Sequence, residues 1–460
     1  MKITLENIGQ IKKAEIDLSK DLIVLCGGNN TGKTYAAYTV YGLFRFLEKL
    51  AKKATLKGIN DKLKTLLITG SVNLNLEEVF LAEKQNIINI IKLGYVDYLA
   101  TVFASPKDFF KYAQIDVKID ERIALSEISF FEIDTVRKFS PQTTATFNKE
   151  RGSLLINITT VSEDEDTLTA LSIIKEISNS ISHIIFQTFS DDAYIAPAER
   201  LAINIFSREL SEKRNKLVDD VLNFDKNQDA SDYIGKNATR YSLPIKDSLQ
   251  LAEKLDVLQK EKSKFTYLAD EIETNILKGK MKISEYGGVT FNPDKTQLNL
   301  DINLTASGVK SLASIIFYLR HLAKVGDFYI IDEPELNLHP DNQRKIARII
   351  AQMVNAGIKV MISTHSNYII RELNNLIMLN VNNKENKKEA TKLLEKYGYQ
   401  KEEILDYNKV GAYLFTSNFT KILVSNLEVT NTGFEIATID KETEELNESS
   451  SDIFFTLHND

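Results

Sequence analysis

The sequence contains very little cysteine: Cys26 is the single cysteine among 460 residues. A framework of disulfide bonds is therefore excluded, and the composition fits a reducing compartment. Cys26 lies within an apolar run, where a thiol behaves as a small hydrophobic side chain. We therefore predict that Cys26 has a packing role.

Segments for membrane insertion or secretion are missing as well. No apolar run is long enough to cross a bilayer. The first ten residues, MKITLENIGQ, already resemble a strand and lack the charged and apolar regions of a leader. These features predict a soluble, cytoplasmic protein without a membrane partner.

Negative charge is concentrated near the C-terminus. The net charge of the chain is −7, but residues 402–460 hold twelve acidic and three basic residues, so residues 1–401 carry a net charge of +2. The acidic balance of the whole chain therefore does not exclude contact between its main part and phosphate groups.

Basic residues are enriched between Arg45 and Lys64, where seven cations stand against two acidic residues. Such runs are usually solvated helix faces, and contact with nucleic acid is the alternative. The seven cations are Arg45, Lys49, Lys52, Lys53, Lys57, Lys62 and Lys64.

The most informative stretch covers residues 22–43, where an apolar run, a glycine-bracketed loop and an amphipathic pattern predict a strand, a loop and a helix. The spacing of Gly27, Gly32, Lys33 and Thr34 matches a phosphate-binding loop. Backbone N–H groups of such a loop surround an anion, and the helix points its positive end at it. Lys33 is expected to reach the β- and γ-phosphates, and the Thr34 hydroxyl to bind Mg²⁺. The predicted nucleotide-binding residues of this loop are Gly27, Asn29, Asn30, Thr31, Gly32, Lys33 and Thr34.

Hydrophobic periodicity outlines the rest of the chain. Period-two alternation predicts a β-hairpin over residues 1–26, a small sheet over 115–160 and strands over 281–304. The apolar run HIIFQTF, residues 183–189, resembles a buried strand. Residues 209–277 are charged and helical without a sustained heptad pattern, which predicts a short helical protrusion instead of a long coiled coil.

A second chemical signal is the apolar stretch FYIIDEPELNLHP, which predicts a strand that ends at Asp332 and Glu333. A phosphohydrolase needs one carboxylate to hold the water shell of Mg²⁺ and another to orient or deprotonate the attacking water. Asp332 and Glu333 have the right chemistry for these two tasks.

Two shorter motifs complete the pattern. TASGVKSL places Ser307 and Gly308 at the start of a predicted helix, where small residues and free N–H groups form an anion site. Because the loop at residues 27–34 already holds one nucleotide, this second site is expected to bind the γ-phosphate of a nucleotide held by a partner subunit. VMISTHS ends a further predicted strand at His365, from which a γ-phosphate contact is expected.

The motifs GGNNTGKT, TASGVKSL, IIDEPELNLHP and ISTHS, in this order, resemble the Walker A, signature, Walker B with D-loop, and switch motifs of ABC-type ATPase heads. More narrowly, the chain resembles the AAA-15-like branch that includes the overcoming-lysogenization-defect ATPases. Its relatives are ATPase subunits of anti-phage systems such as Septu, Gabija, PARIS and some retrons.

The resemblance implies a homodimer or higher homo-oligomer with ATP and Mg²⁺ between subunits, so that Lys33 of one subunit faces Ser307 of the other. It assigns Asp332 to Mg²⁺, Glu333 to the catalytic base and His365 to the γ-phosphate. It also implies communication across the dimer by residues 337–339.

The remaining nucleotide contacts are less well marked. Gln187 lies near the end of the predicted strand at residues 183–189, and the resemblance suggests it as the Q-loop glutamine near Mg²⁺. No aromatic residue is singled out for stacking on adenine.

The predicted fold class is α/β, a P-loop NTPase of the ABC-ATPase-head type with a mixed sheet flanked by helices and a helical and β insertion. The predicted units are a split head over residues 1–45 and 280–380, an insertion over 46–279 with a β region at 115–160 and a protrusion at 209–278, and an acidic α/β region over 381–460 that completes the fold.

The chain departs from family members that carry their own nuclease. A Toprim nuclease domain needs a strand-end glutamate and a downstream Asp-x-Asp to bind metal. The candidate strand TKILVSNLEV offers Ser425 in place of the glutamate, and ATIDKE offers Asp440 alone. An in-chain Toprim domain is therefore not expected, and an effector, possibly a nuclease, is expected on another chain.

Three functions are compatible with these patterns. The first is an ATP-hydrolysing molecular switch that dimerises through composite ATP sites and controls an effector in anti-phage defence, a role that rests on the resemblance. The alternative is a DNA-binding repair or recombination clamp gated by ATP, which the basic run supports. A transporter ATPase fits less well, because the insertion between the first and second motifs is too long.

Overall fold

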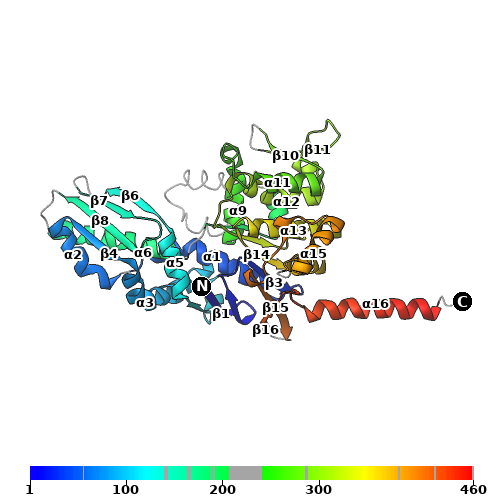
Figure 1. Cartoon of the computed structure of the whole chain (residues 1–460), viewed down its shortest axis with the longest axis horizontal. Coiled ribbons are helices and arrows are strands. Elements are labelled where there is room, and N and C mark those ends of the chain that lie inside the picture. The colour runs from blue at the N-terminus through cyan, green and yellow to red at the C-terminus, as the bar shows by residue number, and fades with distance from the viewer. Residues whose placement is uncertain are drawn as a thin grey trace, which may run out of the picture.

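A computed structural model gives the structure of the protein and describes residues 1–54, 56–138, 143–162, 167–187, 189, 192–206, 241–284, 288–381, 384–418 and 421–457. Within these ranges a nine-stranded mixed sheet lies at the centre of the molecule (Figure 1), in the order β5-β1-β2-β16-β15-β3-β14-β13-β9. Its strands are β1 (Lys2–Ile8), β2 (Ile11–Asp17), β3 (Leu22–Gly27), β5 (Gln114–Lys118), β9 (Ala193–Ala196), β13 (Phe328–Asp332), β14 (Lys359–Thr364), β15 (Val410–Asn418) and β16 (Lys421–Leu427).

Strand direction divides this sheet into two parts. The five strands from β9 to β15 run parallel, whereas β1 pairs antiparallel with both β2 and β5. The antiparallel β1–β2 pair confirms the hairpin predicted for the first 26 residues. The α/β fold with a mixed sheet flanked by helices is therefore confirmed.

The central strand β3 is buried on both faces of the sheet, as expected for a parallel strand covered by helices. Ile23 and Leu25 belong to one hydrophobic cluster together with residues of α1 (Lys33–Ala51). Leu22, Val24 and Cys26 belong to the cluster on the other face, which confirms the packing role of Cys26. The helices of that second face include α12 (Ser307–Phe317), α13 (Pro340–Asn355) and α14 (Asn367–Met378).

A second lobe contains a four-stranded antiparallel sheet in the order β4-β8-β7-β6, at the left of Figure 1. Its strands are β4 (Ser71–Asn75), β6 (Ile133–Lys138), β7 (Thr143–Lys149) and β8 (Leu155–Ser162), and nearby helices are η1 (Lys57–Ile59), α2 (Asn60–Thr69), α3 (Leu76–Val96), α4 (Leu99–Val102), η2 (Lys107–Phe110), α5 (Glu121–Phe130) and α6 (Thr167–Gln187). The small sheet predicted within residues 115–160 is thus present.

Part of that prediction was wrong. Ile115 and Val117 lie in β5, which pairs with β1 at the edge of the large sheet. Ile128 lies in helix α5, whose first N–H groups are capped by the Asp120 carboxylate. Alternation predicted a strand in this region, but the choice of its partner strand depends on contacts distant in sequence.

The strand predicted at residues 183–189 was also wrong. Most of this run lies in the last two turns of α6, which ends at Gln187. Buried Ile177, Ile181 and Ile185 are four residues apart and form one apolar face of that helix. The strand that enters the large sheet is β9, a few residues later.

The third part of the structure precedes α12 and covers the second face of the head. It comprises α9 (Leu243–Glu253), α10 (Leu255–Leu258), α11 (Thr266–Glu271), the π-helix η3 (Ile272–Leu277), and strands β10 (Gly279–Ile283), β11 (Val289–Pro293) and β12 (Leu300–Asp301), followed by η4 (Ile302–Leu304). The antiparallel β10-β11-β12 sheet confirms the strands predicted over 281–304. The first part of the predicted protrusion falls within residues 207–240, which lie outside the described residues.

The last part of the chain extends the large sheet and then leaves it. Strand β15 lies beside β3, and β16 lies between β15 and β2. The final helix α16 (Ala437–Leu457) extends away from the body of the molecule (Figure 1). The other helices of this half are η5 (Tyr318–Leu322), α15 (Lys384–Tyr397), η6 (Lys401–Glu403) and η7 (Tyr407–Lys409). None of the helices in the described ranges is both long and apolar enough to cross a membrane.

Gly27, the last residue of β3, has no room for a side chain. Its φ is 143°, and a Cβ there would lie 2.4 Å from the Phe415 carbonyl oxygen in β15. We expect Gly27→Ala to lower the free energy of unfolding by about 1–3 kcal/mol, because the backbone of β15 must shift. Thermal or denaturant unfolding without nucleotide measures the effect. Gly28→Ala is the matched control because a Cβ at Gly28 meets nothing within 4 Å; equal stability of the two variants would contradict the explanation.

Candidate functional site

The candidate site lies where four neighbouring parallel strands end. In the register of the sheet, Ser363 of β14 is opposite Asp332 of β13, and Thr364 is opposite Cys26 of β3. Strand β9 runs beside β13 in the same direction. Because parallel strands present their carboxyl ends at the same edge, the loops after β3, β9, β13 and β14 meet there.

The loop after β3 has the shape of an anion cradle. Gly32 adopts φ 81° at the N-cap of α1, and Asn30 adopts φ 59°, left-handed conformations that glycine and asparagine tolerate. The Thr31 hydroxyl donates to the Gly28 carbonyl at 2.8 Å and closes the loop. Within the described chain no side chain caps the N-terminus of α1, so its N–H groups are available to an anion. The loop therefore fits a phosphate group.

Lys33 reaches back over this loop. Its Nζ donates to the Gly27 carbonyl at 2.9 Å and to the Gly28 carbonyl at 2.7 Å. Burial lowers the pKa of Lys33, and the carboxylates of Glu333 and Asp332 oppose that shift. A phosphate oxygen is a stronger partner for the ammonium than a neutral carbonyl.

Asp332 and Thr34 provide two adjacent oxygen groups. The Thr34 hydroxyl donates to Asp332 Oδ2 at 3.0 Å, and the Ser363 hydroxyl donates to Asp332 Oδ1. Burial raises the pKa of Asp332 to about 6, although both hydrogen bonds lower it. A hydroxyl and a carboxylate are ligands that Mg²⁺ prefers, with phosphate oxygens and water completing its shell. These two residues therefore fit a magnesium ion bound together with a nucleotide.

Glu333 follows directly and has an unusual backbone. Its φ is 52°, which for a residue with a side chain costs on the order of 1 kcal/mol. Its N–H donates to the Ser363 carbonyl at 3.0 Å, so the turn is held in place. The side chain remains 30% exposed and lies 3.9 Å from His365 Nδ1. The structure thus brings Glu333 and His365 together at the strand ends, with a carboxylate that solvent can reach.

Glu335 is a member of this site that the sequence patterns did not single out. Its carboxylate is 5% exposed and accepts hydrogen bonds from the Thr364 hydroxyl at 2.8 Å and the His365 N–H at 2.9 Å. The same oxygen, Oε1, lies 3.4 Å from His365 Nδ1. Glu335 therefore fixes the loop after β14 against the loop after β13. The sequence feature that could have identified this residue is the second glutamate of the segment DEPEL, residues 332–336.

Arg200 is the second residue of this site that the sequence patterns did not single out. It is 1% exposed, and four of its five N–H groups donate to backbone carbonyls. These carbonyls belong to Asp332 and Glu333, each at 2.6 Å, and to Ser311 and Pro197, at 2.9 and 3.1 Å. The guanidinium thus joins the end of β13 to helix α12 and to the end of β9. The sequence feature that could have identified Arg200 is the charged pair Glu199-Arg200, which follows Pro197 at the end of an apolar segment.

Ser307 and Gly308 lie at the start of α12, and Ser307 is exposed. The Ser311 hydroxyl, one turn later, donates to the Leu336 carbonyl at 3.1 Å and fixes this helix against the residues after Glu335. Among the described residues no hydrogen bond joins Ser307 or Gly308 to the phosphate loop of the same chain. Ser307 is therefore open to solvent, whereas Gly308 is half-buried beside Asn337.

The assignment of Gln187 as a Q-loop residue loses its structural basis. The assignment depended on a strand over residues 183–189, but Gln187 is the last residue of helix α6. Glu199, and not Gln187, is the polar residue that follows strand β9 at the site. Its Oε2 accepts a hydrogen bond from the Tyr38 hydroxyl at 2.9 Å. Tyr38 lies one turn after Thr34 on α1.

The parallel strand ends, the phosphate loop and the adjoining carboxylates define an α/β protein of the P-loop nucleotide-binding class. A family model described as "AAA ATPase domain" matches residues 1–370, and the chain belongs to that family. No curated protein matches the chain.

Three solved structures are similar over most of the chain. The first is the "SmcHead bound to the C-winged helix domain of ScpA", with 11% identity, a TM-score of 0.35 and coverage of 93% of this chain and 98% of that chain. The second is the Smc head domain with an extended coiled coil bound to the C-terminal domain of ScpA derived from Pyrococcus furiosus, with 11% identity, a TM-score of 0.35 and coverage of 98% of each chain. The third is the SMC head domain from Thermotoga maritima, with 10% identity, a TM-score of 0.31 and coverage of 93% of this chain and 98% of that chain.

The buried guanidinium allows a test of how the site is positioned. We expect Arg200→Lys to lower kcat for ATP hydrolysis by on the order of 100-fold, because one ammonium cannot reach four carbonyls on three segments and Glu333 moves. ATP affinity is expected to change little, since Lys33 and the loop are unaffected. Steady-state kinetics and equilibrium ATP binding measure the two effects. Arg348→Lys is the control, because Arg348 is also largely buried but binds Glu372 elsewhere; equal kcat losses would contradict the positioning role.

Proposed function

We propose that the protein is a Mg²⁺-dependent ATP-hydrolysing switch whose composite ATP sites form between subunits and which controls a separate effector. The observation that carries this proposal is the meeting of Lys33, Thr34, Asp332, Glu333 and His365 at one edge of the sheet. Membership of the AAA ATPase domain family supports the ATPase activity.

Each residue at this edge has one task in the proposed reaction. The loop N–H groups and the Lys33 ammonium bind the β- and γ-phosphates of ATP. Thr34 and Asp332 hold Mg²⁺, which neutralises phosphate charge when it is bound. Glu333 accepts a proton from water as the water oxygen attacks the γ-phosphorus, and the bond to the β–γ bridging oxygen breaks to release ADP. His365 contacts the γ-phosphate.

The proposed dimer follows from the outward position of Ser307. Helix α12 begins with two small residues, and within the described chain no side chain caps its N-terminus. Such a terminus attracts anions, yet it makes no hydrogen bond to its own phosphate loop. A second subunit that placed its γ-phosphate there would complete both sites, with residues 337–339 at the contact. Asn337 is exposed and adopts φ 59°.

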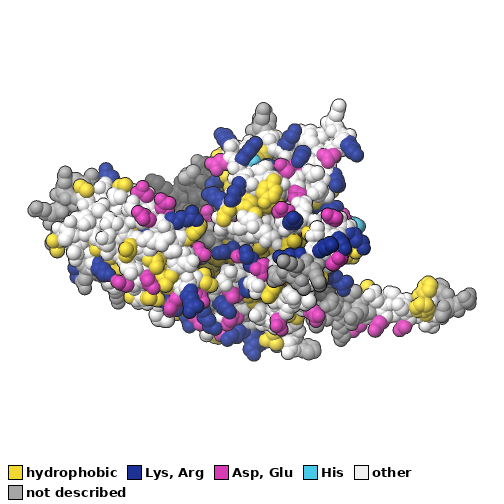
Figure 2. Space-filling view, in the orientation of Figure 1, with side chains coloured by type: hydrophobic (Ala, Val, Ile, Leu, Met, Phe, Trp, Pro, Cys, Tyr) yellow, Lys and Arg dark blue, Asp and Glu magenta, His cyan; other side chains and the backbone are white. Residues whose placement is uncertain are grey.

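A separate effector is supported by the end of the chain. Helix α16 projects from the body and carries exposed hydrophobic side chains toward its far end (Figure 2), including Leu446, Ile453, Phe455 and Leu457. Exposed apolar groups of this kind favour contact with another protein. Ser425 lies in β16, an inner strand of the large sheet, and we propose that this region completes the head instead of forming a nuclease. The role in cytoplasmic anti-phage defence rests on the motif resemblance.

Ion pairs within the chain weaken the support that the basic run gives to the DNA-clamp alternative. Arg45 binds Asp247 at 3.0 Å, Lys52 binds Glu48 at 2.8 Å and Lys62 binds Glu78 at 3.0 Å. Paired cations contribute less to a field that attracts phosphates. We therefore put forward the switch alone.

The chemistry predicts two separable losses. Lys33→Ala is expected to abolish ATP binding, because the loop loses its cation. Glu333→Gln is expected to keep ATP binding but to reduce turnover by at least about 100-fold, because the amide accepts no proton. Equilibrium binding of labelled ATP and release of phosphate measure the two steps. Robust hydrolysis by the Glu333→Gln protein would remove Glu333 as the base.

Subunit association gives a further prediction. When Mg²⁺ and ATP are added, the native mass of the Glu333→Gln protein is expected to at least double, because unhydrolysed ATP holds two subunits together. Native mass spectrometry or light scattering measures the change. Ser307→Arg in the same background is expected to prevent it while ATP still binds to each subunit through Lys33.

The same sample isolated from its native host tests the effector. A second protein is expected to accompany the closed assembly and to be lost when residues 445–460 are removed. An unchanged mass with nucleic acid alone co-purifying would contradict the dimer and favour the DNA clamp. A partner that remains after the truncation would exclude α16 as its contact.

A further inference from the structure

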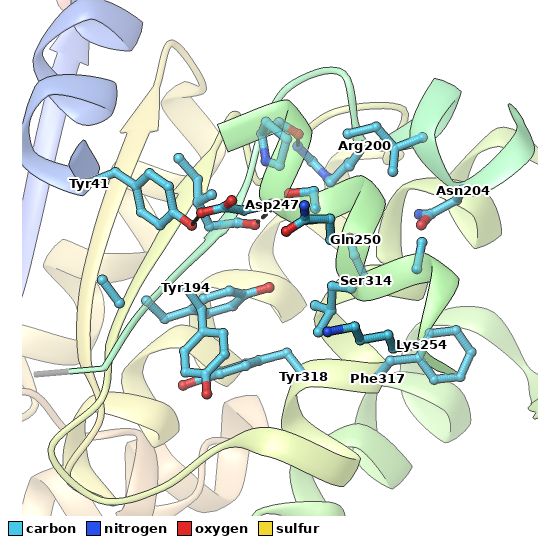
Figure 3. Close-up of a pocket in the computed structure, with 18 of the residues that line it drawn as sticks. Tyr41, Tyr194, Arg200, Asn204, Asp247, Gln250, Lys254, Ser314, Phe317 and Tyr318 are labelled. Carbon is cyan, nitrogen blue, oxygen red and sulfur yellow. Dashed lines mark hydrogen bonds between the residues drawn. The ribbon is translucent and has the colours of Figure 1, made fainter. Parts of the chain in front are cut away.

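A cavity with a volume of about 200 Å³ lies beside the candidate site, on the side of Arg200 that faces α9 and α12 (Figure 3). Its walls come from α1, β9, the residues after β9, α9, α12 and β13. None of the phosphate-loop residues 27–34 lines it, although Arg200 does. The cavity is therefore distinct from the place where a nucleotide would bind but touches the residue that positions Asp332 and Glu333.

Polar groups without partners surround this cavity. The Ser314 hydroxyl is buried and has no hydrogen-bond partner in the described part of the chain. Within the same ranges, no hydrogen bond or ion pair is made by the Tyr194 hydroxyl, the Gln250 amide or the Lys254 ammonium. Figure 3 shows these four side chains around one space. Of these four groups the Ser314 hydroxyl is buried, Tyr194 and Gln250 are half-buried, and Lys254 is exposed at the rim. Buried polar groups are nearly always paired, so the unpaired Ser314 hydroxyl, with three more polar groups at the same cavity, indicates a polar ligand.

The charges of the lining residues favour an anion. Arg45, Arg200 and Lys254 are cationic, and Asp247 is the one anion among the lining residues of the described chain. Asp247 is already neutralised, because its Oδ2 accepts from Arg45 Nε at 3.0 Å and from the Tyr41 hydroxyl at 2.7 Å. The Lys254 ammonium is therefore left to attract an anionic oxygen group.

The hydrogen-bonding groups fit the same ligand. Burial raises the pKa of Tyr194 to about 12, so its hydroxyl keeps its proton and can donate. The Ser314 hydroxyl and the Gln250 amide are further donors. The remaining wall is largely apolar and includes Leu251 and Phe317. Because the cavity is smaller than the usual site of a drug-sized molecule, one ring with one acidic group is the appropriate size.

We propose that this cavity binds a small organic anion, with a carboxylate or phosphate-ester group near Lys254 and a ring against Phe317 and Leu251, and that its binding alters ATP hydrolysis. The second part rests on the proposed ATPase function. Arg200 provides the connection, because it lines the cavity and donates to the carbonyls of Asp332 and Glu333. It also donates to Ser311 of α12, the helix that begins at Ser307.

Binding is tested first, with the full-length Glu333→Gln protein in saturating Mg²⁺ and ATP, so that the nucleotide site is occupied. The probes are 4-hydroxybenzoate, phenyl phosphate and the neutral analogue benzamide, and isothermal calorimetry or ligand-observed NMR measures their affinity. We expect at least one anion to bind about tenfold more tightly than benzamide. The two anions distinguish a carboxylate from a phosphate ester as the recognised group.

Two variants locate the binding. Lys254→Glu is expected to weaken the anion about tenfold by reversing the charge at the rim. Ser314→Leu is expected to abolish binding by filling the cavity, and unfolding measurements show whether it remains folded. Lys260→Glu makes the same charge change on an exposed residue outside the lining and is expected to have no effect. Absence of saturable anion binding, equal binding of benzamide, or equal effects of the two lysine variants would overturn the site.

Coupling is tested with the wild-type protein by measuring ATP turnover with and without the anion that binds. A change in kcat of at least about twofold that disappears in Lys254→Glu supports coupling through Arg200. Unchanged turnover despite saturated binding would overturn the coupling but leave the site. A protein that binds the anion but hydrolyses no ATP under any condition would instead contradict the proposed function.

Discussion

The buried guanidinium of Arg200 is the interaction on which the candidate site depends. A charge removed from water is tolerated only when hydrogen bonds replace its hydration, and here four backbone carbonyls do so. Those carbonyls lie at the ends of β9 and β13 and in α12, so they are in place only when all three segments are assembled. The left-handed backbone of Glu333, held by Arg200 on one side and Ser363 on the other, is one consequence.

In this arrangement, different segments of the chain face the phosphate loop of the same chain and the surface where a second subunit is proposed to bind. The residues that face the phosphate loop of the same chain come from strand ends, whereas Ser307 and Asn337 face outward on α12 and the loop after β13. Arg200 donates to the backbone carbonyls of Asp332 and Glu333 and to that of Ser311 in α12, the helix that begins at Ser307. In the proposed dimer, a change at one nucleotide would therefore reach the helix that contacts the other nucleotide. The adjoining cavity gives a small ligand access to the same guanidinium.

The glutamates of the segment DEPEL illustrate how environment separates residues of one type. Glu333 remains partly exposed near His365, where its carboxylate can meet water. Glu335, two residues later, is buried and accepts hydrogen bonds from Thr364 and His365, which makes it an anchor between two loops. Sequence alone marks both as acidic, and burial assigns them different tasks.

The hairpin, the phosphate loop, the strand that ends at Asp332 and the helix that begins at Ser307 could all be predicted from the sequence, because each depends on local spacing and turn chemistry. Tertiary structure decided that residues 114–118 join the large sheet, that residues up to Gln187 are helical, and that Arg200 and Glu335 belong to the site. These outcomes depend on partners far away in the chain, which periodicity cannot specify. Strand pairing and the solvation of buried charge are settled only when distant segments pack together.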